Sequence, residues 1–340
     1  MKKTPVYISF FIFFLLCACS ADAAITSTSA TVDIFAMDTY MTITAYGSNA
    51  KNSVDAIEKL VYQLDRQWSV NNPESEISIL NETKQANISD YTKDILAISD
   101  KMYTLTGGAF NIATFPIVKL WGFTTGNYQI PNPADIDEAL LHLNPSVIEI
   151  DANRAYINDA YVQLGLGAVA KGYTTDLIRD ILVEYDIPSA IVSLGGNIYA
   201  HGTLTGGSPW NVAIQSPFDV NKHLGTLEAA DTAVITSGAY DRCFEADGKI
   251  YHHIIDPETG FPADSGVASI TIVCENAAMA DALSTAVFVM GLEKGIDFWR
   301  ENEKSFDMIF VTEDKKLYIS ENIEPKFKLL DKSFEIFIIE

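Results

Sequence analysis

The chain has 340 residues, of which 48% are hydrophobic and 20% charged, a composition that excludes a largely disordered protein. Its formal net charge of −22 excludes nucleic acid as a partner, because a chain this acidic repels phosphate backbones. Of its four cysteines, only Cys243 and Cys274 lie in the body of the chain, which excludes a disulfide framework and a cysteine-rich metal site.

The first residues have the pattern of an export signal. Lys2 and Lys3 precede an apolar run from 6 to 16 that is too short for a permanent membrane span. Residues 16–19, Leu-Cys-Ala-Cys, fit the Leu-x-x-Cys pattern of bacterial lipoprotein processing, which would make Cys19 the lipidated first residue of the mature chain. The alternative is an ordinary signal peptide that is cleaved near Ala24.

We therefore expect a lipoprotein signal peptide over 1–18, a flexible tether of small and polar residues over 19–30, and one folded domain over 31–340. The protein would be exported and lipid-anchored to a bacterial membrane. That membrane would be the cell inner membrane on its periplasmic side, or the outer surface of the cell envelope.

Hydrophobic periodicity predicts an α+β domain with mixed and antiparallel sheets flanked by helices. No internal repeat and no convincing linker divides the body of the chain. Strands are expected, in chain order, over 31–35, 40–45, 147–150, 155–157, several segments between 190 and 273, 308–311 and 317–319. Helices are expected over 53–68, 91–105, 168–185 and 277–290.

A glycine-rich turn opens the third of these helices. Residues 165–170 match the Gly-x-Gly-x-x-Ala dinucleotide fingerprint, and Lys171 follows directly. A nicotinamide oxidoreductase also needs an acidic residue after the next strand, but that strand runs into Leu194-Gly-Gly-Asn197. Two interpretations stay open: small residues and a lysine that meet a phosphate, or glycines that only solve packing.

The fourth helix places a carboxylate on an apolar face. Asp281 and Thr285 are four residues apart, so they share one side of a helix that is otherwise almost entirely apolar. Asp281 lies past the first turn, where a role at the helix N-terminus explains it poorly. A bound cation would satisfy both oxygens, so the pair predicts a metal site.

Three further segments are candidates for ligand contacts. His252 and His253 precede a tight-turn sequence over 256–260, and alternation along a strand would send the two imidazoles to opposite faces. A histidine with the ordinary pKa of about 6.5 is suited to take a proton near neutral pH. Residues 236–242 combine hydroxyls with an arginine and suit phosphate contacts. Residues 106–111 with 116–123 either hold a flat ring or form a helix stop and a core strand.

Eight blocks, in order, resemble the ApbE family of FAD:protein FMN transferases, and the resemblance spans roughly residues 33–300. The blocks are Met37-Asp-Thr-Tyr-Met, Ser75-Glu-Ile with Leu80-Asn81, Gly107-Gly-Ala-Phe-Asn111, Leu166-Gly-Ala-Val-Ala-Lys-Gly172, Leu194-Gly-Gly-Asn197, Thr236-Ser-Gly238, His253-Ile-Ile-Asp-Pro257 with Thr259-Gly260, and Ala280-Asp281 with Thr285-Ala286. The resemblance implies a single catalytic domain of T-fold-like architecture.

The resemblance also implies an activity and a site. The enzyme would take FAD and Mg²⁺, transfer the FMN phosphoryl group to a Thr or Ser hydroxyl of a partner protein, and release AMP. Asp281 and Thr285 would bind the cation through side chains and Ala168 through its carbonyl, and His253 would be the catalytic base. The other ligand contacts implied are Met37, Ala109, Phe110, Asn111, Gly165, Lys171, Ser237 and Ile254. This chain has Gly165 and Asn111 where the family often has aspartate.

The acceptors implied are exported or membrane-bound redox proteins, such as flavoprotein subunits of the Rnf type or of the sodium-translocating NADH:quinone reductase type. Two other functions use the same site. One is a metal-dependent FAD pyrophosphatase that gives FMN and AMP, with water in place of the protein hydroxyl. The other is a non-enzymatic FAD-binding lipoprotein.

The lipid anchor gives the first testable prediction. Cys19→Ala should leave an unprocessed or differently cleaved protein that no longer partitions into detergent, because the acyl chains have lost their attachment point. Detergent phase separation and the mass of the processed chain measure both effects. A Cys19→Ala protein that is processed normally and still partitions with the membrane would place the anchor elsewhere.

Overall fold

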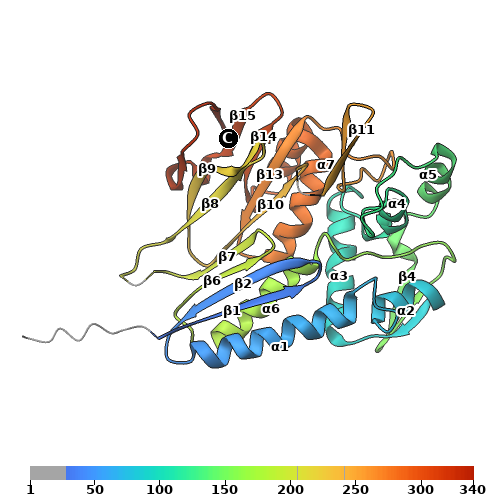
Figure 1. Cartoon of the computed structure of the whole chain (residues 1–340), viewed down its shortest axis with the longest axis horizontal. Helices are drawn as coiled ribbons and strands as arrows, with labels where there is room; N and C mark the ends of the chain where they lie inside the picture. The colour runs from blue at the N-terminus through green and yellow to red at the C-terminus, as the bar shows by residue number, and fades with distance from the viewer. Residues whose placement is uncertain (1–27, 205, 241) are drawn as a thin grey trace, which may run out of the picture.

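The computed structural model describes residues 28–204, 206–240 and 242–340 (Figure 1). The expected signal peptide, Cys19 and the tether up to residue 27 lie outside the described residues. Strand β1 (Ser29–Ala36) begins at Ser29, two residues before the expected start of the folded domain at 31. Ser29 and Ala30 pair with Tyr46 and Ala45 of strand β2, so the backbone of both residues belongs to the sheet.

A nine-stranded sheet forms the centre of the domain, in the order β1-β2-β6-β7-β10-β13-β14-β15-β17. Every neighbouring pair is antiparallel except β15 and β17, which are parallel. The remaining bounds are β2 Thr39–Tyr46, β6 Ser189–Leu194, β7 Asn197–Gly202, β10 Thr232–Gly238, β13 Val267–Cys274, β14 Asp307–Thr312, β15 Lys316–Ser320 and β17 Glu335–Ile339.

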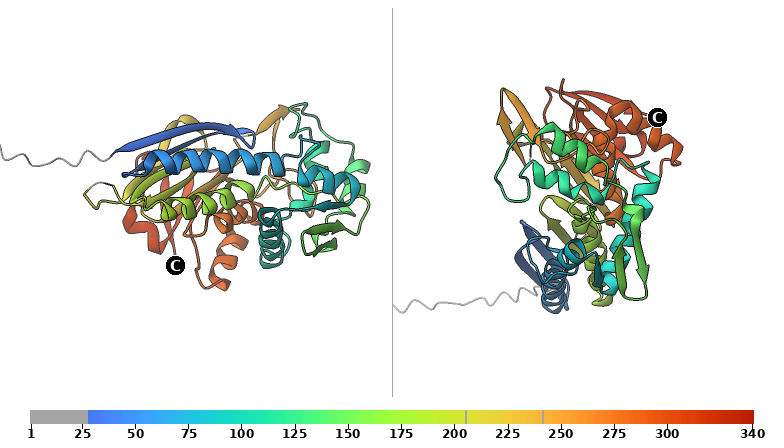
Figure 2. Two further views of the ribbon diagram at one scale, coloured as in Figure 1. Left: turned by 90° about the horizontal axis from the view of Figure 1, so that it is seen from below. Right: turned by 90° about the vertical axis from the view of Figure 1, so that its right-hand side faces the viewer.

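Three helices cover one face of this sheet: α1 (Ala50–Trp68), α6 (Ala170–Glu184) and α7 (Ala277–Glu301). Figure 2, in the view from below, shows α1 and α6 side by side along the sheet. The sequence explains both surfaces. In α1, Val54, Ile57 and Val61 recur at helical spacing and are buried, while in β2 every second residue from Met41 to Ala45 is buried.

The other face of the sheet is covered by a three-stranded sheet of order β16-β9-β8. Leu227 of this small sheet and Ile309 of β14 belong to the same buried apolar cluster, which joins the two sheets. The bounds are β8 Trp210–Ser216, β9 Asp219–Ala229 and β16 Phe327–Leu329, with the 3₁₀ helix η3 over Glu321–Lys326 before the last.

Residues 76–163 form a further region at the right-hand end of Figure 1. It holds α2 (Glu76–Thr83), α3 (Asp90–Leu105), α4 (Phe115–Leu120), α5 (Pro133–Leu140), and a sheet of order β3-β5-β4. The strands are β3 Gln85–Asn87, β4 Ile148–Asp151 and β5 Arg154–Ile157, and the 3₁₀ helices are η1 Ile112–Thr114 and η2 Pro145–Val147. A separate hairpin, β11 (Cys243–Ala246) and β12 (Lys249–His252), completes the fold.

The predicted α+β class is confirmed, and the expected helices over 53–68, 91–105 and 168–185 correspond to α1, α3 and α6. The fourth, expected over 277–290, corresponds to the first segment of α7. Gly291 interrupts the helix there, because its φ of 77° and ψ of −179° are not helical and are available to glycine alone, and a second helical segment then runs to Glu301. The sequence analysis did not predict α2, α4 or α5.

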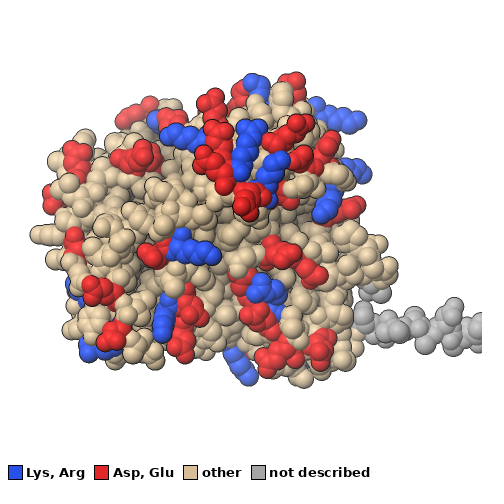
Figure 3. Space-filling model, turned by 180° about the vertical axis from the view of Figure 1, so that it is seen from behind, with Lys and Arg blue, Asp and Glu red and all other residues tan. Residues whose placement is uncertain are grey.

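Two properties of the surface bear on partners. Figure 3 shows acidic and basic side chains interspersed over the face seen from behind. Within the residues that the structure describes, no helix combines the length and the apolar character needed to cross a membrane.

Candidate active site

A cavity of about 520 Å³ lies where the first turn of α6, the second and third turns of α7 and the turn between β1 and β2 meet the segment that follows β12. The structure brings eleven of the twelve sequence-predicted ligand and metal residues to its wall. They are Met37, Ala109, Asn111, Gly165, Ala168, Lys171, Ser237, His253, Ile254, Asp281 and Thr285.

Phe110 is the exception, because the structure buries it completely in the main core instead of at the cavity wall. The chain turns at Gly107 and Gly108, both of which have positive φ, and the N–H of Phe110 then donates to Thr106 Oγ1. This turn directs the ring inward. The expectation that Phe110 lines a ligand surface is therefore corrected.

Asp281 is the most deeply buried charge in the cavity wall, with 4% of its surface exposed. Its Oδ2 accepts the N–H of Gly172 at 2.8 Å, and its Oδ1 accepts Nδ2 of Asn197 at 2.9 Å. The Lys171 ammonium lies 3.8 Å from the same Oδ1. These donors fix the direction of the carboxylate and reduce the cost of burying it.

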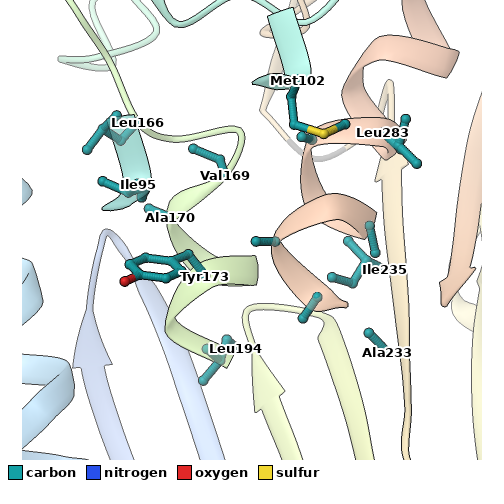
Figure 4. Close-up of a cluster of buried hydrophobic side chains, with 14 of the residues drawn as sticks. Ile95, Met102, Leu166, Val169, Ala170, Tyr173, Leu194, Ala233, Ile235 and Leu283 are labelled. Carbon is teal, nitrogen blue, oxygen red and sulfur yellow. The ribbon is translucent and has the colours of Figure 1, made fainter. Parts of the chain in front are cut away.

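Gly172 permits this arrangement by letting α6 and α7 approach closely. A Cβ at 172 would lie 2.3 Å from the carbonyl oxygen of Ala277 and 2.6 Å from Cβ of Asp281. Gly167 differs, because a Cβ there would meet nothing within 4 Å. The sequence left open whether these glycines serve helix packing or make room for a ligand. Gly172 serves packing, whereas Gly167 leaves open space at the cavity. Figure 4 shows the apolar side chains around this junction, among them Val169, Ala170 and Leu283.

The donor set at this wall fits a hard divalent cation. Asp281, Thr285 and Ala168 line the same cavity and offer a carboxylate, a hydroxyl and a backbone carbonyl. Among the described residues no cluster of three or more His, Cys, Asp or Glu could hold a metal by itself. A cation here would complete its shell with water and ligand oxygens, as magnesium does when it is bound with phosphates.

The two neighbouring histidines have different environments. His252 is buried, its Nε2 lies 3.0 Å from the carbonyl oxygen of Ala263, and its ring meets Phe288 edge-on. His253 lines the cavity, and its Nδ1 has no hydrogen-bond partner in the described part of the chain. The structure therefore directs His253, and not His252, to the ligand space.

Burial, together with the nearby charges of Arg242, His252 and Lys171, lowers the pKa of His253 to about 3. The expectation that this imidazole keeps the pKa of free histidine is wrong, because the sequence did not reveal the desolvation or the two cations. In the free protein the ring is neutral near pH 7, which is the form that accepts a proton.

Other polar residues of the wall are held by their neighbours. Ser237 Oγ lies 2.8 Å from Ser284 Oγ, and Ser284 Oγ donates to the carbonyl oxygen of Asp281. The amide of Asn111 donates to the Leu143 carbonyl at 2.7 Å and accepts the N–H of Ala113 at 2.8 Å. These two bonds fix the orientation of the Asn111 amide in the wall and leave it one N–H and one lone pair for a ligand.

The helix stop expected before 106–111 is confirmed, because α3 ends at Leu105, but the core strand expected within 116–123 is wrong, because Phe115–Leu120 form helix α4. Phe123 lines the cavity together with Phe115, which precedes the segment, and their rings offer surface to a flat ligand. Trp121 lies in a separate apolar core, and its Nε1 donates to the carbonyl oxygen of Gly260 at 2.9 Å.

Sequence reasoning missed two residues that orient this site. Asn197 belongs to a glycine-rich turn that was noted, but its contact with Asp281 spans 84 residues of chain and left no local signal. Asp65, on α1, accepts the N–H of Met37 at 2.8 Å and holds the left-handed turn of Met37, whose φ is 51°. Positive φ at a methionine is uncommon, and Asp65 supports it.

The packing at Gly172 gives a prediction. Gly172→Ala should lower the free energy of unfolding by about 1–3 kcal/mol, the usual cost of overpacking, because its methyl group would displace α7. Urea unfolding measures the change. Gly167→Ala is the matched control and should leave stability nearly unchanged. Equal stability of the two variants would contradict the close approach of α6 and α7.

Comparison with known proteins supports a family assignment. The chain is similar to the FAD:protein FMN transferase of Treponema pallidum, with 35% identity over 301 residues that make up 83% of each chain. It is also similar to an FAD:protein FMN transferase of Klebsiella pneumoniae, with 30% identity over 83% of this chain and 90% of that one.

Solved structures share the fold. The ApbE protein of Thermotoga maritima superposes with a TM-score of 0.82 at 29% identity, over 88% of this chain and 99% of that one. The flavin transferase ApbE of Vibrio cholerae superposes with a TM-score of 0.78 at 25% identity, over the same shares. The model of the ApbE family matches residues 37–310. The chain therefore belongs to the ApbE family.

Proposed function

We propose that the chain is an FAD:protein FMN transferase, which moves the FMN phosphoryl group of FAD to a Thr or Ser hydroxyl of another protein and releases AMP. The observation that carries the proposal is a single cavity that joins Asp281 and Thr285 to the imidazole of His253. Phosphoryl transfer requires charge neutralisation at the phosphates and a base at the attacking hydroxyl. Asp281 and Thr285 would hold the cation that supplies the first, and His253 would be the base. Relatives that bear this name support the assignment.

Asp281, Thr285 and the backbone carbonyl of Ala168 would hold a magnesium ion. When bound, the ion would neutralise charge on the diphosphate of FAD. Lys171 adds a positive charge beside Asp281, within reach of the same phosphates. Phe115 and Phe123 in the cavity wall offer apolar surface to the flavin or the adenine ring.

His253 would take the proton from the acceptor hydroxyl. The hydroxyl oxygen then forms a bond to the FMN phosphorus, while the bond from that phosphorus to the bridging oxygen breaks and AMP leaves with its electron pair. The negative charge that FAD brings into the cavity favours the protonated imidazole, so the pKa of His253 should rise when the ligand binds.

The acceptors we propose are exported or membrane-bound redox proteins, such as flavoprotein subunits of the Rnf or sodium-translocating NADH:quinone reductase type. The export signal and the Leu-x-x-Cys pattern that ends at Cys19 support an enzyme lipid-anchored at a bacterial membrane. These residues lie outside the described part of the chain.

One incubation tests the activity against its alternatives. The protein is mixed with FAD, Mg²⁺ and a candidate acceptor, and the flavin products are separated. Acid-stable flavin on the acceptor supports the transferase, free FMN with AMP supports the pyrophosphatase, and unchanged FAD supports a binding protein. An acceptor whose Thr or Ser is replaced by Ala is the control.

The residues proposed to hold the cation give a further prediction. Asp281→Ala should abolish magnesium-dependent turnover of FAD, because Asp281 is the carboxylate assigned to the cation. Thr285→Val removes a neutral ligand at nearly constant shape and should raise the half-saturating magnesium concentration by about 10-fold or more with a smaller loss of maximal rate. Turnover is measured against magnesium concentration in variants that melt cooperatively. Full activity in a folded Asp281→Ala protein would contradict the site.

A third prediction concerns the base. His253→Ala should lower transfer by roughly 10²- to 10⁴-fold while FAD still binds, because the proton of the hydroxyl loses its acceptor. In the ligand-free enzyme, burial and nearby cations place the pKa of His253 at about 3, so the imidazole stays neutral between pH 7 and pH 5. Because kcat/KM reports the ionisation of the free enzyme, it should stay level over that range.

His252→Ala is the matched comparison. His252 is held by the Ala263 carbonyl, so its loss should reduce stability more than transfer. Near wild-type transfer by His253→Ala would mean that no histidine base is needed, and an acid limb near pH 6.5 would contradict the low pKa.

A further inference from the structure

We infer that Asp176 is a positioning residue for the metal site, although it does not line the cavity. Its carboxylate projects from α6 and holds the first turn of α7, and thereby sets the direction from which Asp281 and Thr285 reach the cavity. The inference rests on the proposed function, because it concerns how the cation ligands of that function are aligned.

The contacts of Asp176 join the two helices. Its Oδ1 accepts the N–H of Ala277 at 3.0 Å, and its Oδ2 accepts the N–H of Ala278 at 2.9 Å. Nη1 of Arg179 donates to Oδ1 at 2.9 Å. Only 7% of Asp176 is exposed. The carboxylate thus satisfies two N–H groups that the first turn of a helix leaves unpaired, and it meets the positive end of the helix dipole.

Asp176 differs from a local helix cap in where it comes from. The local cap of α7 is Asn276, whose side chain accepts only the N–H of Met279, at 2.7 Å, so the N–H groups of Ala277 and Ala278 depend on a residue of another helix. Burial raises the pKa of Asp176, while the two amides and Arg179 lower it, so this carboxylate is kept in place at a desolvation cost. The additional contact ties α7 to a different helix, which a local cap cannot do.

The second link between the helices lies one turn away. Gly172 and Asp176 are four residues apart on α6, and Ala277 and Asp281 are four residues apart on α7, so both links join the same two faces. At one link the Gly172 N–H donates to Asp281, and at the other Asp176 accepts from Ala277 and Ala278. The sheet already supports α7, which packs against β10 and β13. The two links to α6 add a restraint on the first two turns of α7, on which the placement of the cation ligands depends.

The test compares Asp176 with a matched carboxylate elsewhere. Glu76 also caps a helix from outside it, since its Oε2 accepts the N–H of Ser89 at the start of α3 at 2.9 Å, and it does not line the cavity. Asp176→Asn, Asp176→Ala, Glu76→Gln and Glu76→Ala are made in the full chain. Each is measured by thermal melting, by Mn²⁺ binding in the presence of FAD followed by the EPR signal of free Mn²⁺, and by FAD turnover against magnesium concentration.

Both Glu76 variants should lose stability with an unchanged Mn²⁺ affinity. Asp176→Ala should weaken Mn²⁺ binding and raise the half-saturating magnesium concentration by about 10- to 100-fold, the range seen when a residue that orients metal ligands is lost. Asp176→Asn keeps the shape and one acceptor oxygen, so it should fold and show a smaller shift in the same direction. It carries the test if Asp176→Ala does not fold.

An Asp176→Asn protein with wild-type Mn²⁺ affinity and wild-type magnesium dependence would overturn the inference and leave Asp176 a structural residue. So would a loss of Mn²⁺ affinity in the Glu76 variants as large as in the Asp176 variants. Failure of the proposed function is a separate result. If the proposed function is wrong, the unaltered protein binds Mn²⁺ and FAD but yields no protein-bound flavin. The Mn²⁺ affinities of the variants still decide the role of Asp176 in that case.

Discussion

The close contact between α6 and α7 at Gly172 and Asp281 is the constraint on which the site depends. The absence of a side chain at 172 lets the backbone of α6 reach the Asp281 carboxylate and donate to it directly. A charge on an otherwise apolar helix face would be costly without such donors. Because Asn197 comes from the sheet, the carboxylate is fixed by two elements at once, and its direction follows from how helices and sheet pack.

The antiparallel sheet brings the remaining parts of the site to the same edge. Consecutive antiparallel strands turn at alternate ends, so the turn after β1, the turn after β6 and the end of β10 lie together. These positions supply Met37, Asn197 and Ser237 to the cavity wall. The first two turns also contact each other, because the N–H of Gly195 donates to the carbonyl oxygen of Tyr40 at 3.0 Å. A cavity built this way draws on residues that are distant in sequence.

Hydrophobic periodicity was sufficient to predict the elements with a regular buried face, such as α1 and β2, and to single out the position of Asp281 on α7. It failed to predict features that depend on the conformation of one residue or on contacts with distant segments. The left-handed turn at Gly107 and Gly108 sends Phe110 into the core. The second helical segment of α7, which follows the non-helical Gly291, was not predicted either. The low pKa of His253 depends on burial and on cations that come from other segments, so no pattern within its own segment could predict it.

Charge in the cavity explains why a cation and the proposed ligand belong together. Three carboxylates line the wall, those of Asp38, Asp65 and Asp281, against two cations, Lys171 and Arg242. With His253 neutral, the wall carries no excess of positive charge with which to attract a diphosphate, and the chain as a whole carries −22. A divalent ion beside Asp281 would reverse that balance at the point where the phosphates bind. Because the pKa of His253 is low, the imidazole of the ligand-free protein is uncharged and does not attract the anionic ligand. The attraction would then come mainly from the metal ion, so binding of the ligand and binding of the metal should be thermodynamically coupled.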